Sequence, residues 1–153
     1  GHLAEWPVGR YHKAHFHTGG AILLILRSEG YTLMWPQEAG IRPYKSGNGD
    51  QVVKVNWREG SVFSPPTGWF HQHFNTGKEK ARQLAFRYSS QSGKYLFGVW
   101  KAINKEGVRT SIREGGTLIE YEDEDPQIRQ DFEAAIDRVA VPMEMPVFQY
   151  AEL

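Results

Sequence analysis

Histidine is the residue type in this chain best placed to do chemistry, because five of its six copies lie in two short segments. The first segment reads GRYHKAHFH and the second reads GSVFSPPTGWFHQHFN. Residues two apart on a β-strand point to the same side. Each His-x-His pair is therefore expected to direct two imidazoles into one space, where neighbouring strands can build a metal site. The five histidines are His12, His15, His17, His71 and His73.

Both segments resemble sequence motifs of the cupin family. In the first cupin motif a glycine is followed by five residues and then by His-x-His, and Gly9, His15 and His17 fit that spacing. The second motif is a glycine, five residues, Pro-x-Gly, two residues, a histidine, three residues and an asparagine. This chain has every one of those positions, at Gly60, Pro66, Gly68, His71 and Asn75. The resemblance implies an all-β fold, a double-stranded β-helix or jelly-roll barrel.

One departure from the cupin pattern affects the expected ligand set. The family places a glutamate a few residues after its first His-x-His, where this chain has Ala21 and Ile22. The resemblance then implies a three-histidine metal site, formed by His15, His17 and His71. This set is similar to that of the branch containing gentisate-type, cysteine-type and diketone-cleaving dioxygenases. The branch implies Fe(II), with an open face for a small-molecule substrate and dioxygen.

Elementary coordination chemistry agrees with a three-imidazole site. Imidazole suits Fe, Zn, Cu and Ni. The Fe(II) that the resemblance implies is one of these ions, and Zn, Mn, Ni or Cu are alternatives. A catalytic metal needs an unfilled position, and three protein ligands leave at least one. Without a carboxylate ligand the site keeps the full charge of the metal, which favours an anionic or chelating substrate. A catecholate, an aromatic hydroxy acid and an enolised dicarbonyl all meet this description.

Further residues are candidates for roles around the metal. His73 has the same strand parity as His71 and is expected to contact the ligands or the substrate, because outer partners normally orient ligating imidazoles. His73 and Tyr11 are the candidates for proton transfer. The candidates for lining the substrate pocket are Phe16, Trp69, Phe70, Arg27 and Arg87. Aromatic residues equally fill β cores, and arginines equally form ordinary surface charges.

Two histidines are expected to lie away from this site. His12 is out of step with the parity of His15 and His17, so a surface or rim position is expected. His2 follows Gly1 at the start of the chain and is interpreted as a remnant of cloning.

Composition restricts the class of protein. The 153 residues suit one domain, and the absence of cysteine excludes disulfides and thiolate metal sites. Lysine plus arginine equals aspartate plus glutamate, at 18 each, so nucleic acid is not an expected partner. The longest apolar run is too short to cross a bilayer and no secretory signal is seen, which favours the cytoplasm. Whether the chain is a piece of a longer protein stays open.

Short strands separated by turn residues are expected over the first two-thirds of the chain. The polar segment Pro36–Asp50 is expected to be a loop, either a cover for the barrel mouth or an ordinary surface connection. The barrel is predicted to occupy residues 1–110. Its expected strands are Leu3–Val8, Gly20–Leu26, Tyr31–Trp35, Gln51–Trp57, Ser61–Ser64, Phe70–Phe74 and Ala81–Tyr88.

Residues 111–153 are expected to form a strand, a helix and a tail that pack on the barrel or on a second protomer of a homodimer. Apolar residues recur every three or four positions after Asp125 and Pro126, which predicts an amphipathic helix of about three turns. The acidic run Glu120–Asp125 is interpreted as solvated charge at the helix start. Leu96–Ile103 is an apolar patch, Thr117–Tyr121 a possible edge strand, and Val141–Leu153 an extended tail that can cross to another protomer.

Three function classes follow from these observations. The first is a non-haem Fe(II) dioxygenase that cleaves a small chelating substrate. The second is a metal-dependent lyase, isomerase or decarboxylase, in which the ion acts as a Lewis acid. The third is a small-molecule-binding cupin without catalysis. The missing glutamate favours the first class, and oxygen dependence separates it from the second.

Overall fold

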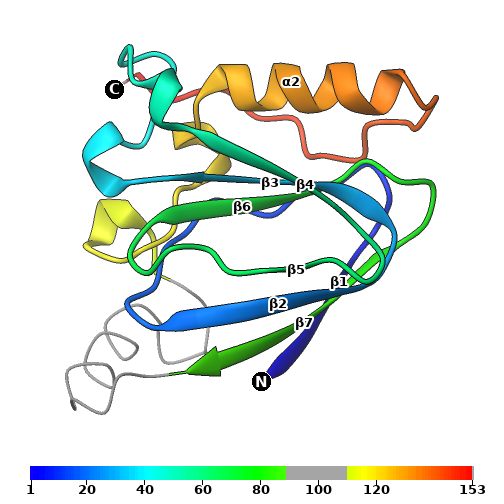
Figure 1. The fold of residues 1–153 in the computed structure, drawn as a ribbon. Coiled ribbons are helices and arrows are strands. Elements are labelled where there is room, and N and C mark those ends of the chain that lie inside the picture. Colours follow the sequence, from blue (N-terminus) through cyan, green and yellow to red (C-terminus); the bar gives the residue numbers. More distant parts are fainter. Residues whose placement is uncertain (89–109, 153) are drawn as a thin grey trace.

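The computed structural model describes residues 1–88 and 110–152 as two antiparallel β-sheets and one α-helix (Figure 1). One sheet has the strand order β1-β7-β2-β5, from His2–Trp6, Ala81–Tyr88, Gly20–Arg27 and Val62–Phe63. The other has the order β4-β3-β6, from Val53–Arg58, Glu29–Trp35 and Phe70–Asn75. The helix, α2 (Pro126–Asp137), covers the outer face of the second sheet.

Alternation along the second sheet separates two environments. Tyr31 pairs with Phe74 and Thr32 pairs with His73 in the register between β3 and β6. Tyr31 and Phe74 point to the helix side, where their rings stack with centroids 4.5 Å apart. Thr32 and His73 point to the space between the two sheets. The histidine-bearing face of β6 is therefore the inner one.

Helix α2 begins and packs as its sequence predicts. The Asp125 carboxylate accepts a hydrogen bond from the backbone N–H of Gln127, and Pro126 is the first helical residue. Ile128, Phe132 and Ile136 recur every four residues and are fully buried against the sheet. Within residues 1–88 and 110–152 no helix has the length and apolar character needed to cross a membrane.

The expected mainly β fold with a C-terminal helix is confirmed, and the structure adds detail at three places. Two sheets are present in the described part of the chain, without a closed barrel. The possible strand Thr117–Tyr121 is reduced to Leu118, which forms isolated bridges with His15 and Ser111. The patch Leu96–Ile103 lies outside the described residues.

The loop Pro36–Asp50 packs against the acidic segment and the C-terminal tail, and it does not line the cavity between the sheets. Arg42 in the loop is buried, and its guanidinium donates to the carbonyls of Glu122, Asp123 and Ala151 at 2.9–3.0 Å. The Ala151 N–H donates back to the Glu122 carbonyl. In this single-chain structure the tail therefore folds onto its own chain.

The expectation of a solvated acidic run holds at Glu122, which is exposed, and is wrong for Asp123, Glu124 and Asp125, which are 1–2% exposed. Each carboxylate has its own partners. Asp123 forms a bidentate pair with Arg113 at 2.5 and 2.6 Å, and Asp125 accepts the Lys45 N–H at 2.8 Å besides capping α2. Buried carboxylates persist only when paired in this way.

Candidate metal centre

Three histidines meet between the two sheets. One nitrogen from each of His15, His17 and His71 lies within 4.8 Å of the others. The ring centroids are 4.5 Å apart for His15 and His71, 4.8 Å for His17 and His71, and 6.1 Å for His15 and His17. The structure thus brings together the three predicted ligands from two segments more than 50 residues apart.

Main-chain hydrogen bonds hold these segments together. The His15 N–H donates to the His71 carbonyl at 3.1 Å, and the His71 N–H donates to the His15 carbonyl at 2.8 Å. Gly68, which adopts a left-handed φ of 80°, donates its N–H to the His17 carbonyl at 3.0 Å. Direct pairing of the two backbones therefore explains the positions of Gly68 and of the motif histidines.

Each of the three imidazoles is oriented by a carbonyl two residues away. Nδ1 of His15 lies 3.3 Å from the Lys13 oxygen, Nδ1 of His17 lies 2.5 Å from the Gly19 oxygen, and Nδ1 of His71 lies 3.0 Å from the Trp69 oxygen. A carbonyl only accepts, so Nδ1 carries the proton and Nε2 carries the lone pair. Ligating histidines in metal sites have this arrangement. The residues present therefore fit a divalent ion.

The three histidines open into a cavity of about 130 Å³ between the sheets. All six histidines of the chain line it, together with Gln83 and Arg87 from β7. Gln83 is buried, and within the described part of the chain its Oε1 has no hydrogen-bond partner. Arg87 supplies a positive charge to the same cavity. This lining suits a small anionic guest with a hydrogen-bond donor.

His73 lies beside the cluster and is held by a short hydrogen-bonded chain. The Trp57 indole N–H donates to the Thr32 hydroxyl at 3.1 Å, and that hydroxyl lies 2.8 Å from Nδ1 of His73. Burial, followed by the neighbouring histidine His71, lowers the pKa of His73 well below its usual value. His73 is therefore neutral, and its ring centroid is 5.7 Å from that of His71. On β6, His73 is the next residue after His71 that faces the cavity.

His12 and His2 also line this cavity, so the expectation that His12 lies away from the site is wrong. The backbones of His12 and His15 pair with His73 and His71 respectively, so three steps on one segment match two on the other. This extra residue acts as a bulge, and it turns His12 inward despite its odd spacing. Burial, and then the charge of His2, lowers the pKa of His12 to about 4. His2 belongs to β1, which pairs along β7.

Ala21 occupies the position of the missing glutamate. Ala21 lines the cavity and is 2% exposed, whereas Ile22 points to the outside of the sheet and is 43% exposed. The inner position therefore holds a methyl group in place of a carboxylate. This leaves histidine as the ligand type that the described residues bring to the cluster.

Several predicted pocket residues lie on the other side of the sheet. Phe16 and Phe70 pack against each other at 5.2 Å in the core beneath α2. Trp69 contributes its carbonyl to His71 but does not line the cavity, and Arg27 lies 3.8 Å from Glu79 on the surface. Of the five, Arg87 is the residue that the structure places at the cavity.

Tyr11 likewise faces the helix side, where it donates a hydrogen bond to Glu124. Gln72, between the two histidines of β6, donates its side-chain N–H to the same carboxylate at 3.0 Å. Burial raises the pKa of Glu124 to about 7, against the opposing effect of these two hydrogen bonds. This buried network backs the metal cluster and was missed, because its members are distant in sequence.

The two sheets thus enclose a polar cavity that contains a three-histidine cluster able to hold a divalent ion. No family model matches the sequence, and no curated protein matches it either.

Solved structures show partial similarity. The capsular polysaccharide assembling protein CapF from Staphylococcus aureus is 13% identical over 60% of this chain and 25% of its own, with a TM-score of 0.46. The Drosophila melanogaster CENP-C cupin domain is 11% identical over 56% of this chain and 58% of its own, with a TM-score of 0.45. A predicted oxalate decarboxylase from Thermotoga maritima is 24% identical over 57% of this chain and 64% of its own, with a TM-score of 0.44. The matched region thus spans a quarter of CapF and less than two-thirds of the other two.

Proposed function

We propose that this chain is a metal-dependent cupin in which His15, His17 and His71 hold a divalent ion. The observation that carries the proposal is the arrangement of the three rings, since each Nδ1 lies beside a backbone carbonyl and one nitrogen of each ring lies within 4.8 Å of the others. The two cupin-like motifs supply these residues at the family spacing.

We propose further that the ion is Fe(II) and that the reaction is the oxidative cleavage of a small chelating substrate by dioxygen. When bound, the iron would supply the one-electron chemistry with dioxygen. The chain supplies neutral ligands, because the cluster contains histidines and Ala21 takes the place of the glutamate. This set keeps the positive charge that draws an anionic substrate.

The residues around the ion support a small, anionic substrate. Arg87 faces the cavity and can pair with a carboxylate or enolate oxygen, and the Gln83 Oε1 can accept a hydrogen bond from a substrate hydroxyl. His73, held neutral by burial, is placed to exchange a proton with a bound molecule. A cavity of about 130 Å³ favours a hydroxy acid or dicarbonyl of few atoms.

The same cavity size favours one second candidate, a metal-dependent decarboxylase or lyase acting on a small carboxylate. The chain's residues would bind and orient that substrate in the same way, and the ion would polarise a carbonyl. The two candidates differ in their need for dioxygen.

The decisive experiment is elemental analysis of the purified protein and of His71→Ala, with Gln130→Ala, on the exposed side of α2, as a control. We expect close to one iron per chain in the wild type and in Gln130→Ala, and loss of the metal in His71→Ala. Iron would be followed by oxygen uptake with a panel of small hydroxy acids and dicarbonyls. Turnover without oxygen would select the second candidate. Equal metal content in His71→Ala, or no metal after reconstitution, would overturn the three-histidine site.

We also propose that the partner of this chain is a second copy of itself. The outer face of the sheet β1-β7-β2-β5 exposes large apolar side chains, among them Leu3, Ile22, Val62 and Phe86. Ile22 and Phe86 are directly paired, and the others lie along the same face. A contiguous apolar face of this kind is typical of a protein–protein interface.

A further inference from the structure

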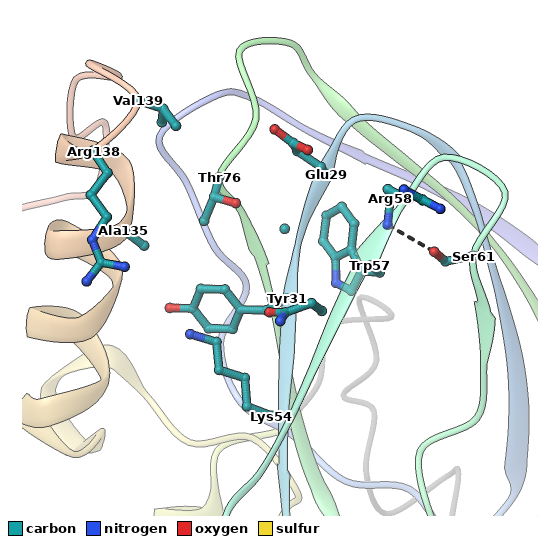
Figure 2. Close-up of a pocket in the computed structure, with 12 residues that line it drawn as sticks. Glu29, Tyr31, Lys54, Trp57, Arg58, Ser61, Thr76, Ala135, Arg138 and Val139 are labelled. Atoms are coloured by element: carbon teal, nitrogen blue, oxygen red, sulfur yellow. Dashed lines mark hydrogen bonds between the residues drawn. The ribbon is translucent and has the colours of Figure 1, made fainter.

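A second pocket lies on the helix side of the sheet β4-β3-β6, away from the histidines. It has a volume of about 550 Å³, within the usual range for small-molecule sites. Its floor comes from β3 and β4, and its wall comes from the C-terminal end of α2 (Figure 2). Tyr31 lines this pocket and its neighbour Thr32 contacts His73, so one strand separates the pocket from the metal cavity.

The pocket contains a buried polar group that has no partner. Tyr31 is 3% exposed, and its hydroxyl forms no hydrogen bond within the described residues. Figure 2 shows this hydroxyl pointing towards α2. A buried hydroxyl without a partner is costly, so such a group normally has a ligand or water to bond with. Burial raises the pKa of Tyr31, so the hydroxyl is a donor at any physiological pH.

Lys54 and Arg138 line the pocket beside this hydroxyl, whereas the charge of Asp131, which is outside the lining, raises the pKa of Tyr31 further. The Lys54 ammonium lies 3.9 Å from the Tyr31 ring centroid, and Arg138 points to the same side of the pocket in Figure 2. Arg58 lines the opposite end together with Glu29. Among the described residues, none of these three cations forms an ion pair with a carboxylate. The lining therefore carries three positive charges against the single negative charge of Glu29.

We propose that this pocket binds a small phosphate monoester, with its phosphate between Tyr31, Lys54 and Arg138. Two excess positive charges match a phosphate dianion, and a guanidinium and an ammonium are the side chains that recognise phosphate. The neutral phenol donates a further hydrogen bond. Ala135 and Val139 line the rest of the pocket and offer apolar surface to the organic part of the ligand.

The test is calorimetric titration at low ionic strength with inorganic phosphate and with phenyl phosphate. We expect saturable one-to-one binding of both, and tighter binding of phenyl phosphate because it adds contact with Ala135 and Val139. Lys54→Gln and Arg138→Gln should each weaken binding about tenfold, the loss of one charge-assisted contact. Tyr31→Phe keeps the ring stacked on Phe74 and removes only the hydroxyl, so it should weaken binding while the fold stays intact.

Two controls make the outcome decisive. Lys45→Gln removes an exposed lysine that does not line the pocket, and it should leave the dissociation constant unchanged. His71→Ala separates this site from the metal cavity, and binding should survive it. Absence of saturable phosphate binding, or equal weakening by Lys45→Gln and Lys54→Gln, would overturn the proposal. So would binding that disappears in His71→Ala, because the phosphate would then be on the metal.

Discussion

His15 and His71 are joined by two reciprocal backbone hydrogen bonds, of 3.1 and 2.8 Å, and their imidazole rings lie 4.5 Å apart. The main chain therefore sets the distance between two of the three ligands, and no side chain is needed for it. Metal binding and folding are separable at this position.

Replacing His15 with alanine should remove the metal and leave the fold. The backbone bridge to His71 does not depend on the imidazole, and His15 is only partly buried, so the loss of stability should be about 1 kcal/mol or less. Metal content and circular dichroism of the same sample provide the check. A variant that unfolds, or one that keeps a full complement of metal, would contradict the ligand assignment.

Ala21→Glu should add a fourth ligand. Its side chain enters the cavity beside the three histidines, so we expect slower loss of metal to a competing chelator than in the wild type. Ile22→Glu is the matched control, because Ile22 points out of the sheet and should change nothing at the metal. Equal metal retention in the two variants would show that position 21 does not reach the ion.

Glu124 should make the protein less stable as pH rises. Its pKa is about 7 in the folded state and 4.5 ordinarily, so between these values the folded state holds a proton that the unfolded state has lost. The free energy of unfolding should therefore fall with pH over this window, by at most about 1.4 kcal/mol per pH unit.

Thermal unfolding of the wild type and of Glu124→Gln from pH 4.5 to 8 measures this contribution. The difference between the two proteins is needed because His12, with its pKa near 4, has the opposite slope up to its ordinary value of 6.5. Glutamine can still accept from Tyr11, and Gln72 has a buried Oε1 that can accept from it. Parallel curves for the two proteins would exclude Glu124 as the titrating group.

Phe132→Ala should cost about 3–5 kcal/mol, since it removes a fully buried ring between Tyr11 and Phe74. Gln130→Ala, on the exposed side of the same helix, should be neutral. Chemical denaturation distinguishes the two variants. A loss below about 1 kcal/mol for Phe132→Ala would mean that α2 contributes little to the core.

Phe86→Arg should convert the proposed dimer to a monomer, because it places a charge in the apolar face of the sheet β1-β7-β2-β5. Val53→Arg changes an equally exposed apolar residue on β4 and should leave the mass in solution unchanged. Sedimentation velocity gives both masses. A wild-type monomer at high concentration would rule the dimer out.

The sequence predicted the clustering of the three histidines more reliably than it predicted their surroundings. His15, His17 and His71 were predictable because two spaced motifs specify them together. Phe16 and Phe70 were assigned to the pocket although each is adjacent to a ligand. Strand alternation alone predicts that both phenylalanines lie on the face opposite the histidines, as the structure shows.

Other features required knowledge of distant contacts. The burial of Asp123, Glu124 and Asp125 depends on Arg113, Gln72 and Lys45, and no local pattern connects these residues. Strand alternation predicted the wrong side for His12, because one extra residue lies between the two points at which its segment pairs with β6. Irregular pairing of this kind has no signature in hydrophobic alternation.

The carbonyls that face the three Nδ1 atoms belong to positions 13, 19 and 69, and a carbonyl is present whatever amino acid occupies the position. Side-chain substitution therefore cannot delete these orienting groups. Trp69→Ala or Lys13→Ala should lose a side chain and keep the ring orientation at the metal. The arrangement of the three rings should therefore tolerate substitutions at the residues next to the histidines. Alanine scanning would not detect the carbonyls that orient the rings.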